Sequence, residues 1–257
     1  MILSRQTIGL LALIRKETRR VLRIWVQTII PPGITMSLYF IIFGTLIGQR
    51  IGQMDGFQYM EYIAPGLIMM SVITNSYGNV VGSFFNAKIQ RHIEEMLVSP
   101  MSEISIVTGY LTGGIIRGIF VAAVVSLITL FFTQLNIQYP VLAILVIVMT
   151  AGVFSLAGLL NAIFAKKFDD IAIIPSFVLA PLTYLGGVFY TISLLPEFWQ
   201  KVSYFNPILY MVNAMRFSVL GESDIDISVG IVVILSFFIL LLCASIFLLK
   251  KGVGIRE

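Results

Sequence analysis

Charged residues are scarce in this chain. Asp, Glu, Lys and Arg make up only 12% of its 257 residues, which is about half of what a soluble domain carries. Hydrophobic residues make up 58%, and the mean hydropathy is +0.97. Together these values exclude a soluble globular protein. Cysteine is scarcer still: Cys243 is the only one, so no intramolecular disulfide can form.

The motifs of an enzyme or of an energy-using subunit are also missing. The dipeptide Gly-Lys never occurs, so the chain has no P-loop for a nucleotide phosphate. His92 is the only histidine, and the sequence has no Gly-x-Ser-x-Gly nucleophile motif. The apolar runs lack the carboxylate pairs of a proton relay. We therefore expect no catalysis, metal or cofactor in this chain, which must be passive or be driven by another subunit.

Long apolar runs are what the chain has in abundance. A run of about 20 apolar residues spans a membrane as a helix. Six such runs are present: Trp25–Gly48, Tyr62–Phe84, Thr108–Phe132, Pro140–Ala165, Ile171–Tyr190 and Ile227–Leu249. They predict one all-α membrane domain over residues 1–257, with no room for a soluble enzyme domain. No cleavable signal peptide is expected, because the positive charges follow the first short apolar run, Thr7–Ile14.

The basic residues predict which side of the membrane each loop faces. Six spans place both termini on the same side, and Lys and Arg accumulate in cytoplasmic loops. With the termini inside, the inner segments hold 13 of the 17 basic residues, and the outer segments hold only Arg50, Lys201 and Arg216. We therefore expect both termini in the cytoplasm. The net charge of +4 reflects this topology, so we expect no nucleic-acid partner.

An amphipathic pattern precedes the first span. At the helical period the apolar side chains fall within an arc of about 100°, opposite the basic ones. The apolar arc holds Leu11, Ile14, Thr18, Val21, Leu22 and Trp25, and the basic arc holds Arg15, Lys16, Arg19, Arg20 and Arg23. This pattern predicts a helix in the cytoplasmic interface, with its basic face toward lipid headgroups. Alternatively, the basic residues only determine the topology. The two readings are compatible, because one basic helix can lie in the interface and determine the topology.

The inner loop between the second and third spans contains a second amphipathic pattern. Apolar residues at i, i+4, i+7 and i+8 form one face, a polar face accompanies it, and Pro100 ends the helix. The apolar face is Ile89, Ile93, Met96 and Leu97, and the polar face is Arg91, Glu94 and Glu95. Such a helix lies on the membrane or enters a groove of a partner. The two glutamates disfavour an anionic lipid surface, so the sequence favours a protein partner.

Two polar features lie within the spans. The second span carries small and polar residues at spacings of three and four, either as helix-packing contacts or as the lining of a pathway. They are Ser71, Asn75, Gly78, Asn79, Gly82 and Asn86. Arg117 near the start of the third span is interpreted as snorkelling to the inner interface, with a gating role as the alternative. Pro175 and Pro181 predict an irregular fifth span.

The segment Leu194–Arg216 is too polar and too broken by proline to span a membrane, yet it is rich in aromatic residues. Pro196 stands at a possible first helical position, and Asn206-Pro207 reads as an N-cap followed by proline at N1. Two short helices joined by a sharp turn are therefore predicted at the outer leaflet. Trp199 and Tyr210 suit the membrane interface.

These residues together carry a family resemblance. Six spans, the inner amphipathic helix and the series Tyr184-Leu-Gly-Gly-Val-Phe-Tyr190, Pro196, Trp199, Asn206-Pro207, Tyr210 and Arg216 resemble the membrane subunit, or permease, of bacterial ABC-2 type exporters. The resemblance covers essentially the whole chain. It implies a multi-pass inner-membrane protein that pairs with a second permease copy and with two cytoplasmic ATPase subunits, which hold the ATP and Mg²⁺.

The resemblance also implies roles for parts of the chain. Residues 88–98 resemble the coupling helix that enters the ATPase, and the basic N-terminal helix resembles a connecting helix near it. The outer hairpin resembles re-entrant helices that cap the pathway between subunits. Ser71, Asn75, Asn79 and Tyr184 are the candidate residues for lining the pathway or the dimer interface. The implied cargo is an amphiphilic, drug-like or lipid-linked or polysaccharide molecule, exported from the cell. The alternative is an ion-coupled or passive transporter without an ATPase.

Overall fold

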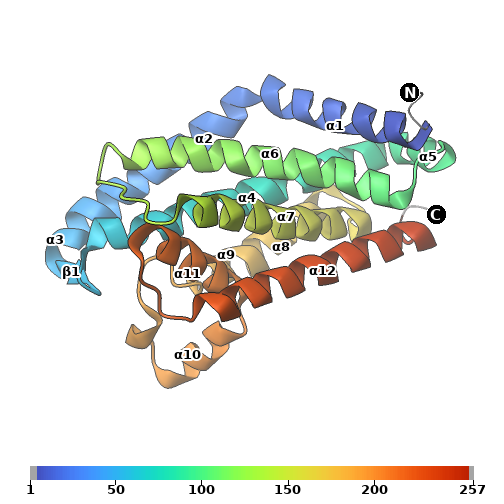
Figure 1. Ribbon diagram of the computed structural model, residues 1–257. Helices are drawn as coiled ribbons and strands as arrows, with labels where there is room; N and C mark the ends of the chain where they lie inside the picture. Colours follow the sequence, from blue (N-terminus) through green and yellow to red (C-terminus); the bar gives the residue numbers. More distant parts are fainter. Residues whose placement is uncertain (1–4, 255–257) are drawn as a thin grey trace.

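The computed structural model describes residues 5–254, and most of them lie in helices (Figure 1). The longest helices run side by side, and both ends of the described chain lie at the same end of the bundle as α5 (Figure 1). The α-helices are α1 (Arg5–Arg23), α2 (Trp25–Tyr39), α3 (Gly48–Ile51), α4 (Tyr59–Ile89), α5 (His92–Val98), α6 (Glu103–Thr129), α7 (Pro140–Phe164), α8 (Phe168–Ile174), α9 (Ala180–Tyr184), α10 (Glu197–Tyr204), α11 (Pro207–Leu220) and α12 (Ile227–Lys251). The prediction of an all-α fold is confirmed.

Three further helical segments depart from α-geometry. They are the π-helical η1 (Phe40–Ile47) and η2 (Pro175–Leu179), and the 3₁₀ turn η3 (Ile192–Leu194). Within residues 5–254 the only strands are β1 (Gln53–Met54) and β2 (Phe57–Gln58), which pair antiparallel. Asp55 and Gly56 join them with φ of 49° and 83°, as a two-residue hairpin turn of the I′ kind requires. The sequence analysis did not predict this ribbon.

Four helical segments of the described chain are long and apolar enough to cross a membrane. They are Trp25–Ile51, Glu103–Thr129, Pro140–Phe164 and Ile227–Lys251, and each matches a predicted span. The other two predicted spans are less regular. Residues 62–84 fall within α4, whose polar stripe lowers its mean hydropathy. Residues 171–190 begin in α8 and pass through η2 to α9, which ends at Tyr184, six residues early. The crossing of the membrane by six spans stays a prediction.

Helix α4 forms the core of the bundle. It packs against α6, α7 and α11, and its side chains from Tyr62 to Met69 are almost all inaccessible. Small residues let the neighbouring backbones approach it closely. A methyl group on Gly158 of α7 would lie 2.6 Å from the carbonyl oxygen of Tyr77, and one on Gly66 would lie 2.7 Å from that of Val188. These contacts set the spacing between α4 and its neighbours.

We expect Gly158→Ala to destabilise the protein by about 2 kcal/mol, because the added methyl group meets backbone that can only move by separating α4 from α7. The measurement is thermal unfolding followed by circular dichroism in detergent micelles. Gly78→Ala on α4 is the matched control, because its methyl group would meet no atom within 4 Å. Equal melting temperatures for the two variants would contradict the close packing.

Side-chain caps fix where several helices begin. The Asp226 carboxylate accepts a hydrogen bond of 2.7 Å from the backbone N–H of Ser228 at the start of α12, and this bond lowers the pKa of Asp226. In the first turn of α8, the Asp170 carboxylate accepts hydrogen bonds from the backbone N–H groups of Lys166 and Lys167, which precede the helix. These bonds lower the pKa of Asp170 as well. The caps explain why these helices begin where the sequence turns from polar to apolar.

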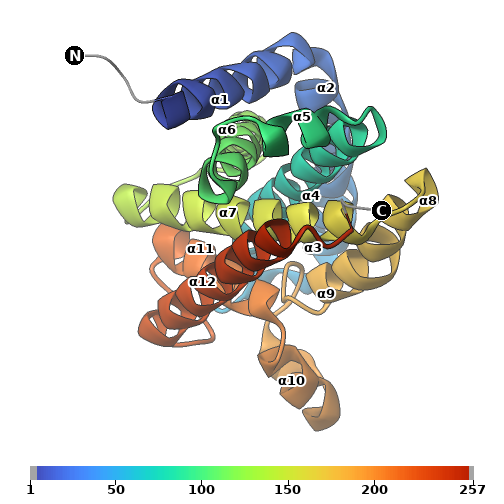
Figure 2. The same ribbon diagram turned by 90° about the vertical axis from the view of Figure 1, so that its right-hand side faces the viewer.

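The outer segment forms two short helices, as predicted. The Asn206 side chain accepts a hydrogen bond of 3.0 Å from the backbone N–H of Ile208, and Pro207 occupies N1 of α11. Pro196, predicted as the first helical residue, is instead the N-cap of α10, and the helix begins one residue later at Glu197. Helix α10 projects away from the bundle, whereas α11 packs inside it against α4, α7 and α12 (Figures 1 and 2). The two helices thus differ in burial, which the sequence did not indicate.

Candidate functional site

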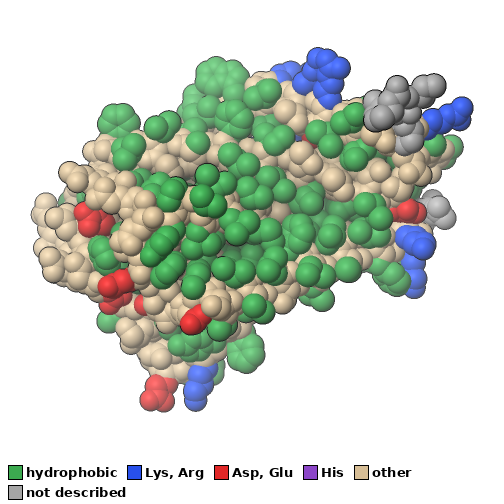
Figure 3. Space-filling view, in the orientation of Figure 1, with side chains coloured by type: hydrophobic (Ala, Val, Ile, Leu, Met, Phe, Trp, Pro, Cys, Tyr) green, Lys and Arg blue, Asp and Glu red, His purple; other side chains and the backbone are tan. Residues whose placement is uncertain are grey.

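Charged side chains separate between the two ends of the molecule. In Figure 3 hydrophobic side chains cover the middle of the visible face, most Lys and Arg side chains gather at the end near α1 and the chain termini, and most Asp and Glu side chains lie toward the other end. A band of apolar surface between two charged ends is the form of a membrane protein. The basic end therefore fits the predicted cytoplasmic side.

The inner loop contains a turn where a continuous helix was predicted. Helix α4 ends at Ile89, and α5 begins at His92. Arg91 lies between them in the left-handed conformation with φ of 59°, so the prediction of one helix through residues 88–98 is wrong. The break separates Ile89 from the apolar face of α5. Without glycine, the sequence offered no signal for a left-handed residue here.

The apolar side of α5 faces the bundle. Ile93 is buried, and Met96 and Leu97 pack against the core. The exposed side chains of α5 and its flanks are Ile89, Arg91, His92, Glu94, Glu95 and Val98. Val98, the last residue of α5, is 89% exposed. The exposed surface of this segment therefore carries two acids and one arginine, with an apolar side chain at each end, Ile89 and Val98.

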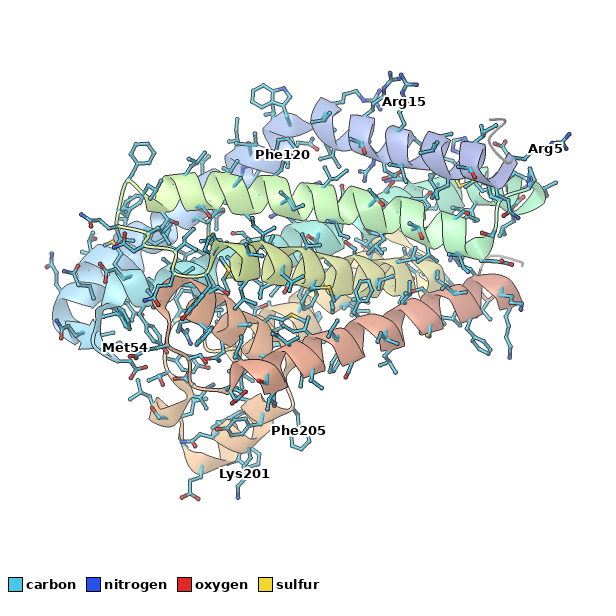
Figure 4. The ribbon with its side chains drawn as sticks, viewed as in Figure 1. Arg5, Arg15, Met54, Phe120, Lys201 and Phe205 are labelled. Atoms are coloured by element: carbon cyan, nitrogen blue, oxygen red, sulfur yellow. The ribbon has the colours of Figure 1, made fainter. Side chains whose placement is uncertain are left out.

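Helix α1 has three faces rather than the two that were predicted. Leu13, Glu17 and Val21, each four residues apart, are buried against the bundle. Three of the six residues of the predicted apolar arc are exposed, namely Leu11, Leu22 and Trp25, while Val21 belongs to the buried face. The basic arc is exposed except for Arg20, and Arg15 projects from α1 away from the bundle (Figure 4). The buried face fits a groove of small residues on α6, because methyl groups on Gly109 and Gly113 would collide with Leu13 and Glu17.

A buried ion pair fixes α1 to α4. We call the four side chains Glu17, Arg20, Asn79 and Ser83 the α1 anchor. The Glu17 carboxylate accepts hydrogen bonds of 2.9 Å from the Ser83 hydroxyl and of 3.0 and 3.1 Å from the Arg20 guanidinium. Arg20 also donates to the backbone oxygen and to Oδ1 of Asn79, at 3.1 and 2.8 Å. Glu17 has no exposed surface, so its charge depends on these donors.

The polar stripe of the second span divides into buried and open parts. Asn79 is buried in the α1 anchor, and Ser71 is 2% exposed. A second series, which we call the open face of α4, consists of Thr74, Gly78, Gly82 and Asn86. These residues are spaced by four, and methyl groups on Gly78 and Gly82 would meet no described atom within 4 Å. Asn75 adjoins this face. A role of Ser71, Asn75, Asn79 and Tyr184 in a pathway or interface stays a prediction.

Arg117 lies midway along α6 rather than near its start, as the snorkelling interpretation assumed. Its Nη2 donates a hydrogen bond of 3.3 Å to the Asn75 Oδ1 on α4, while Nε is buried without a partner. The guanidinium is therefore held between helices.

At the predicted outer end, Arg216 joins α11 to the turn that follows α9. Its side chain is buried, donates a hydrogen bond of 2.6 Å to the backbone oxygen of Gly187, and lies 3.6 Å from a carboxylate oxygen of Asp224. The guanidinium also stacks 4.0 Å from the centre of the Tyr62 ring. The predicted hairpin residue Arg216 thus belongs to the core, whereas Trp199 is 45% exposed. Lys201 and Phe205 project outward near the hairpin turn (Figure 4).

A cavity of about 480 Å³ adjoins Arg216 at the same end. Its charged lining residues are Arg216 and three acids, and its aromatic lining residues are Phe57, Tyr62 and Tyr204. The acids are Asp55, Glu222 and Asp224. The lining carries more negative than positive charge, in contrast to the basic inner end.

Three side chains that join helices were not predicted from the sequence: Glu17, Ser83 and Lys88. The Lys88 ammonium donates hydrogen bonds of 2.7 Å to the backbone oxygens of Ile163 and Ala165, at the C-terminus of α7. A cation at this end also complements the helix dipole. The signal for Glu17 was present in its spacing of four from both Leu13 and Val21. Nothing in the local sequence pointed from Lys88 to α7.

Comparisons with known proteins agree with this architecture. The family model described as ABC-2 type transporter matches residues 9–220. The chain is 54% identical to the Inner membrane transport permease YadH of Escherichia coli (strain K12), over 94% of each chain. It is 21% identical to Nodulation protein J of Rhizobium leguminosarum bv. viciae, over 83% of each chain. Nodulation protein J of Rhizobium leguminosarum bv. trifolii is 24% identical over 74% of this chain and 73% of its own.

Proposed function

The chain belongs to the ABC-2 type transporter family, and on that premise we propose that it is the membrane-spanning permease of an ATP-driven exporter. The observation that carries this is the family match over residues 9–220, together with 54% identity to an inner membrane transport permease. The protein resides in the bacterial inner membrane. It moves an amphiphilic, drug-like or lipid-linked or polysaccharide substrate outward, and separate ATPase subunits hydrolyse ATP.

The proposed topology has six spans, with both termini in the cytoplasm. Four segments have the length and composition of spans, and α4 and the α8–η2–α9 segment supply the other two. Lys250 and Lys251 at the end of α12 and the basic face of α1 agree with this orientation. Helix α10 then lies at the outer leaflet, with Phe198 and Trp199 exposed for contact with the interface.

A second copy of the permease completes the proposed pathway. The open face of α4 is polar and uncovered, on a helix that is otherwise buried. Polar groups at membrane depth face protein or a water-filled path. We infer that this face lines the path between two copies, with Asn75 beside it and Tyr184 nearer the outer end.

The ATPase pair is proposed to act through α5. Its exposed surface holds Glu94, Glu95 and Val98, while Ile93 contacts the bundle on the opposite side. A force applied to the exposed surface therefore reaches the core directly through Ile93. Lys88, just before the turn, ties the inner end of α4 to the C-terminus of α7, so that these two ends move together.

The test measures how well the permease binds its partner ATPase and stimulates the hydrolysis of ATP. We expect Val98→Asp combined with Glu94→Lys to lower both co-purification of the partner ATPase and its stimulation at least about tenfold, because the docking surface loses part of its negative charge and its apolar contact. Both positions are exposed, so the fold is unaffected.

The matched control is Glu197→Lys on α10, an exposed charge reversal at the outer end. It is expected to leave stimulation unchanged. Full stimulation of the ATPase by the α5 double variant would contradict docking at α5. Transport into ATP-free vesicles by the permease alone would instead support the passive alternative.

A further inference from the structure

Arg117 places a positive charge within the bundle, far from both ends of α6. It follows Glu103 by 14 residues and precedes Thr129 by 12, which correspond to about 21 and 18 Å of helix. A charged side chain at membrane depth is expensive, and such residues are typically paired or functional. The partners of Arg117 therefore decide what it does.

Those partners are too few to balance the charge. Within the described residues, the one hydrogen bond of this guanidinium goes to the neutral Asn75 Oδ1, at 3.3 Å. Among residues 5–254 no ion pair within 4 Å joins Arg117 to a carboxylate, and its Nε is buried without an acceptor. Arg20 adds electrostatic repulsion. By contrast, Arg20 itself has Glu17, and Arg216 has Asp224.

A cavity of about 310 Å³ lies beside Arg117, between α2, α4 and α6. Its polar lining consists of Gln27, Thr35, Ser71, Thr74, Asn75 and Arg117. Arg117 is the only charged one of these, so the lining has a net charge of +1. The hydroxyl of Ser71, a residue of this lining, is buried and has no hydrogen-bond partner. The volume is at the lower end of the range for sites that bind small molecules.

The cavity begins close to the predicted membrane interface. Gln27 follows the exposed Trp25 by two residues, and Met36 at the other end of the cavity follows it by eleven. Along α2 the cavity thus reaches from near the cytoplasmic interface to about 16 Å inward. An amphiphile of the inner leaflet can place its headgroup here while its acyl chains stay in the membrane.

The chemistry of the lining favours a phosphate group. A guanidinium binds phosphate through two parallel N–H donors, and hydroxyl and amide groups satisfy the remaining oxygens. We propose that the Arg117 cavity is a subsite for the phosphate group of an anionic amphiphile in the inner leaflet. The inference rests on the proposed function, because it assigns a headgroup class to the cargo of the permease. That phosphate belongs to a membrane phospholipid or to a lipid-linked cargo.

Binding is measured on the purified full chain in dodecyl maltoside micelles. The probes are phosphatidic acid and diacylglycerol with the same fluorescent acyl chain, which differ only in the phosphate. The wild-type protein is expected to prefer phosphatidic acid. Arg117→Gln is expected to weaken phosphatidic acid binding at least about tenfold, the loss of a charged hydrogen bond, and to leave diacylglycerol binding unchanged. The control Arg50→Gln removes an exposed arginine elsewhere and leaves both affinities unchanged.

A second variant separates binding from folding. Asn75→Asp replaces the neutral partner of Arg117 by a carboxylate of nearly the same shape, so the guanidinium gains an internal counter-ion. We expect it to weaken phosphatidic acid binding at least about tenfold while the melting temperature stays equal or rises. Competition by unlabelled phosphatidylglycerol or by a polyprenyl phosphate then distinguishes a phospholipid from a lipid-linked source.

The proposal is overturned if Asn75→Asp and Arg117→Gln bind phosphatidic acid as tightly as the wild type. It is equally overturned if the wild type binds both probes alike, or if only the α1 variants Arg15→Gln and Arg19→Gln lose affinity. Intact stimulation of the ATPase alongside any of these results would leave the proposed permease function standing and remove only the phosphate subsite.

Discussion

Replacing Glu17 by alanine is expected to lower the free energy of unfolding by about 3–5 kcal/mol, the cost of breaking a buried ion pair by removing one partner. The Arg20 guanidinium would lose its carboxylate, and the Ser83 hydroxyl would lose its acceptor. Water replaces these bonds poorly, because only 23% of the Arg20 side chain is exposed. We therefore expect α1 to detach from α4 before the rest of the bundle unfolds.

The measurement for Glu17→Ala has two parts. Thermal unfolding in detergent gives the stability, and trypsin cleavage at the basic residues of α1 reports its detachment. Glu197→Ala is the control, since this glutamate is exposed on α10 and forms no ion pair within residues 5–254. The double variant Glu17→Gln with Arg20→Gln, which removes both charges, should be more stable than Glu17→Ala. If Glu17→Ala melts like the wild type, the α1 anchor does not hold α1.

Replacing Arg216 by methionine is expected to destabilise the protein by about 3 kcal/mol, because removing the buried guanidinium leaves its acceptors without a donor. The Gly187 oxygen loses a hydrogen bond of 2.6 Å, and the Tyr62 ring loses the stacked guanidinium. Asp224 limits the effect, because 18% of its side chain is exposed and water can solvate it. Methionine replaces the unbranched part of the side chain and so leaves a smaller void than alanine would.

This variant should loosen the outer end selectively. Cleavage by trypsin after Lys201, which is exposed on α10, should become faster than in the wild type. Arg50→Met is the control, because Arg50 is exposed and lies on α3. A normal melting temperature with an unchanged rate of cleavage would show that Arg216 does not fix α11 to the turn after α9.

Patterns within a few residues predicted much of this fold. The apolar runs located the long helices, and Asn206-Pro207 located the start of α11 to the residue, because an N-cap and a proline at N1 act locally. Asp55-Gly56 carried a turn signal of the same local kind that the analysis passed over. By contrast, Arg91 adopts a left-handed conformation that only its surroundings can impose.

The candidate site was predicted less well, because burial depends on distant parts of the chain. In the sequence Glu17 looks like a further charge at the membrane interface. It is buried because Gly109 and Gly113 of α6 form the groove in which α1 packs. Ile93 resembles a docking residue until the bundle covers it. Arg117 resembles a snorkelling residue until Asn75 of another helix meets it. In each case the sequence gives the chemistry of the side chain but not its neighbours.

The single helix α4 gives the protein a lever arm. Ile89 at its inner end adjoins the turn to α5, and Gly66 near its outer end touches the backbone of Val188, just before the outer hairpin. These two residues are 23 apart, or about 35 Å along the helix axis. Turning such a rod by only about 5° about one end carries the other end through about 3 Å. A displacement of about 3 Å, the length of one hydrogen bond, at the outer hairpin is thus enough to be transmitted to α5.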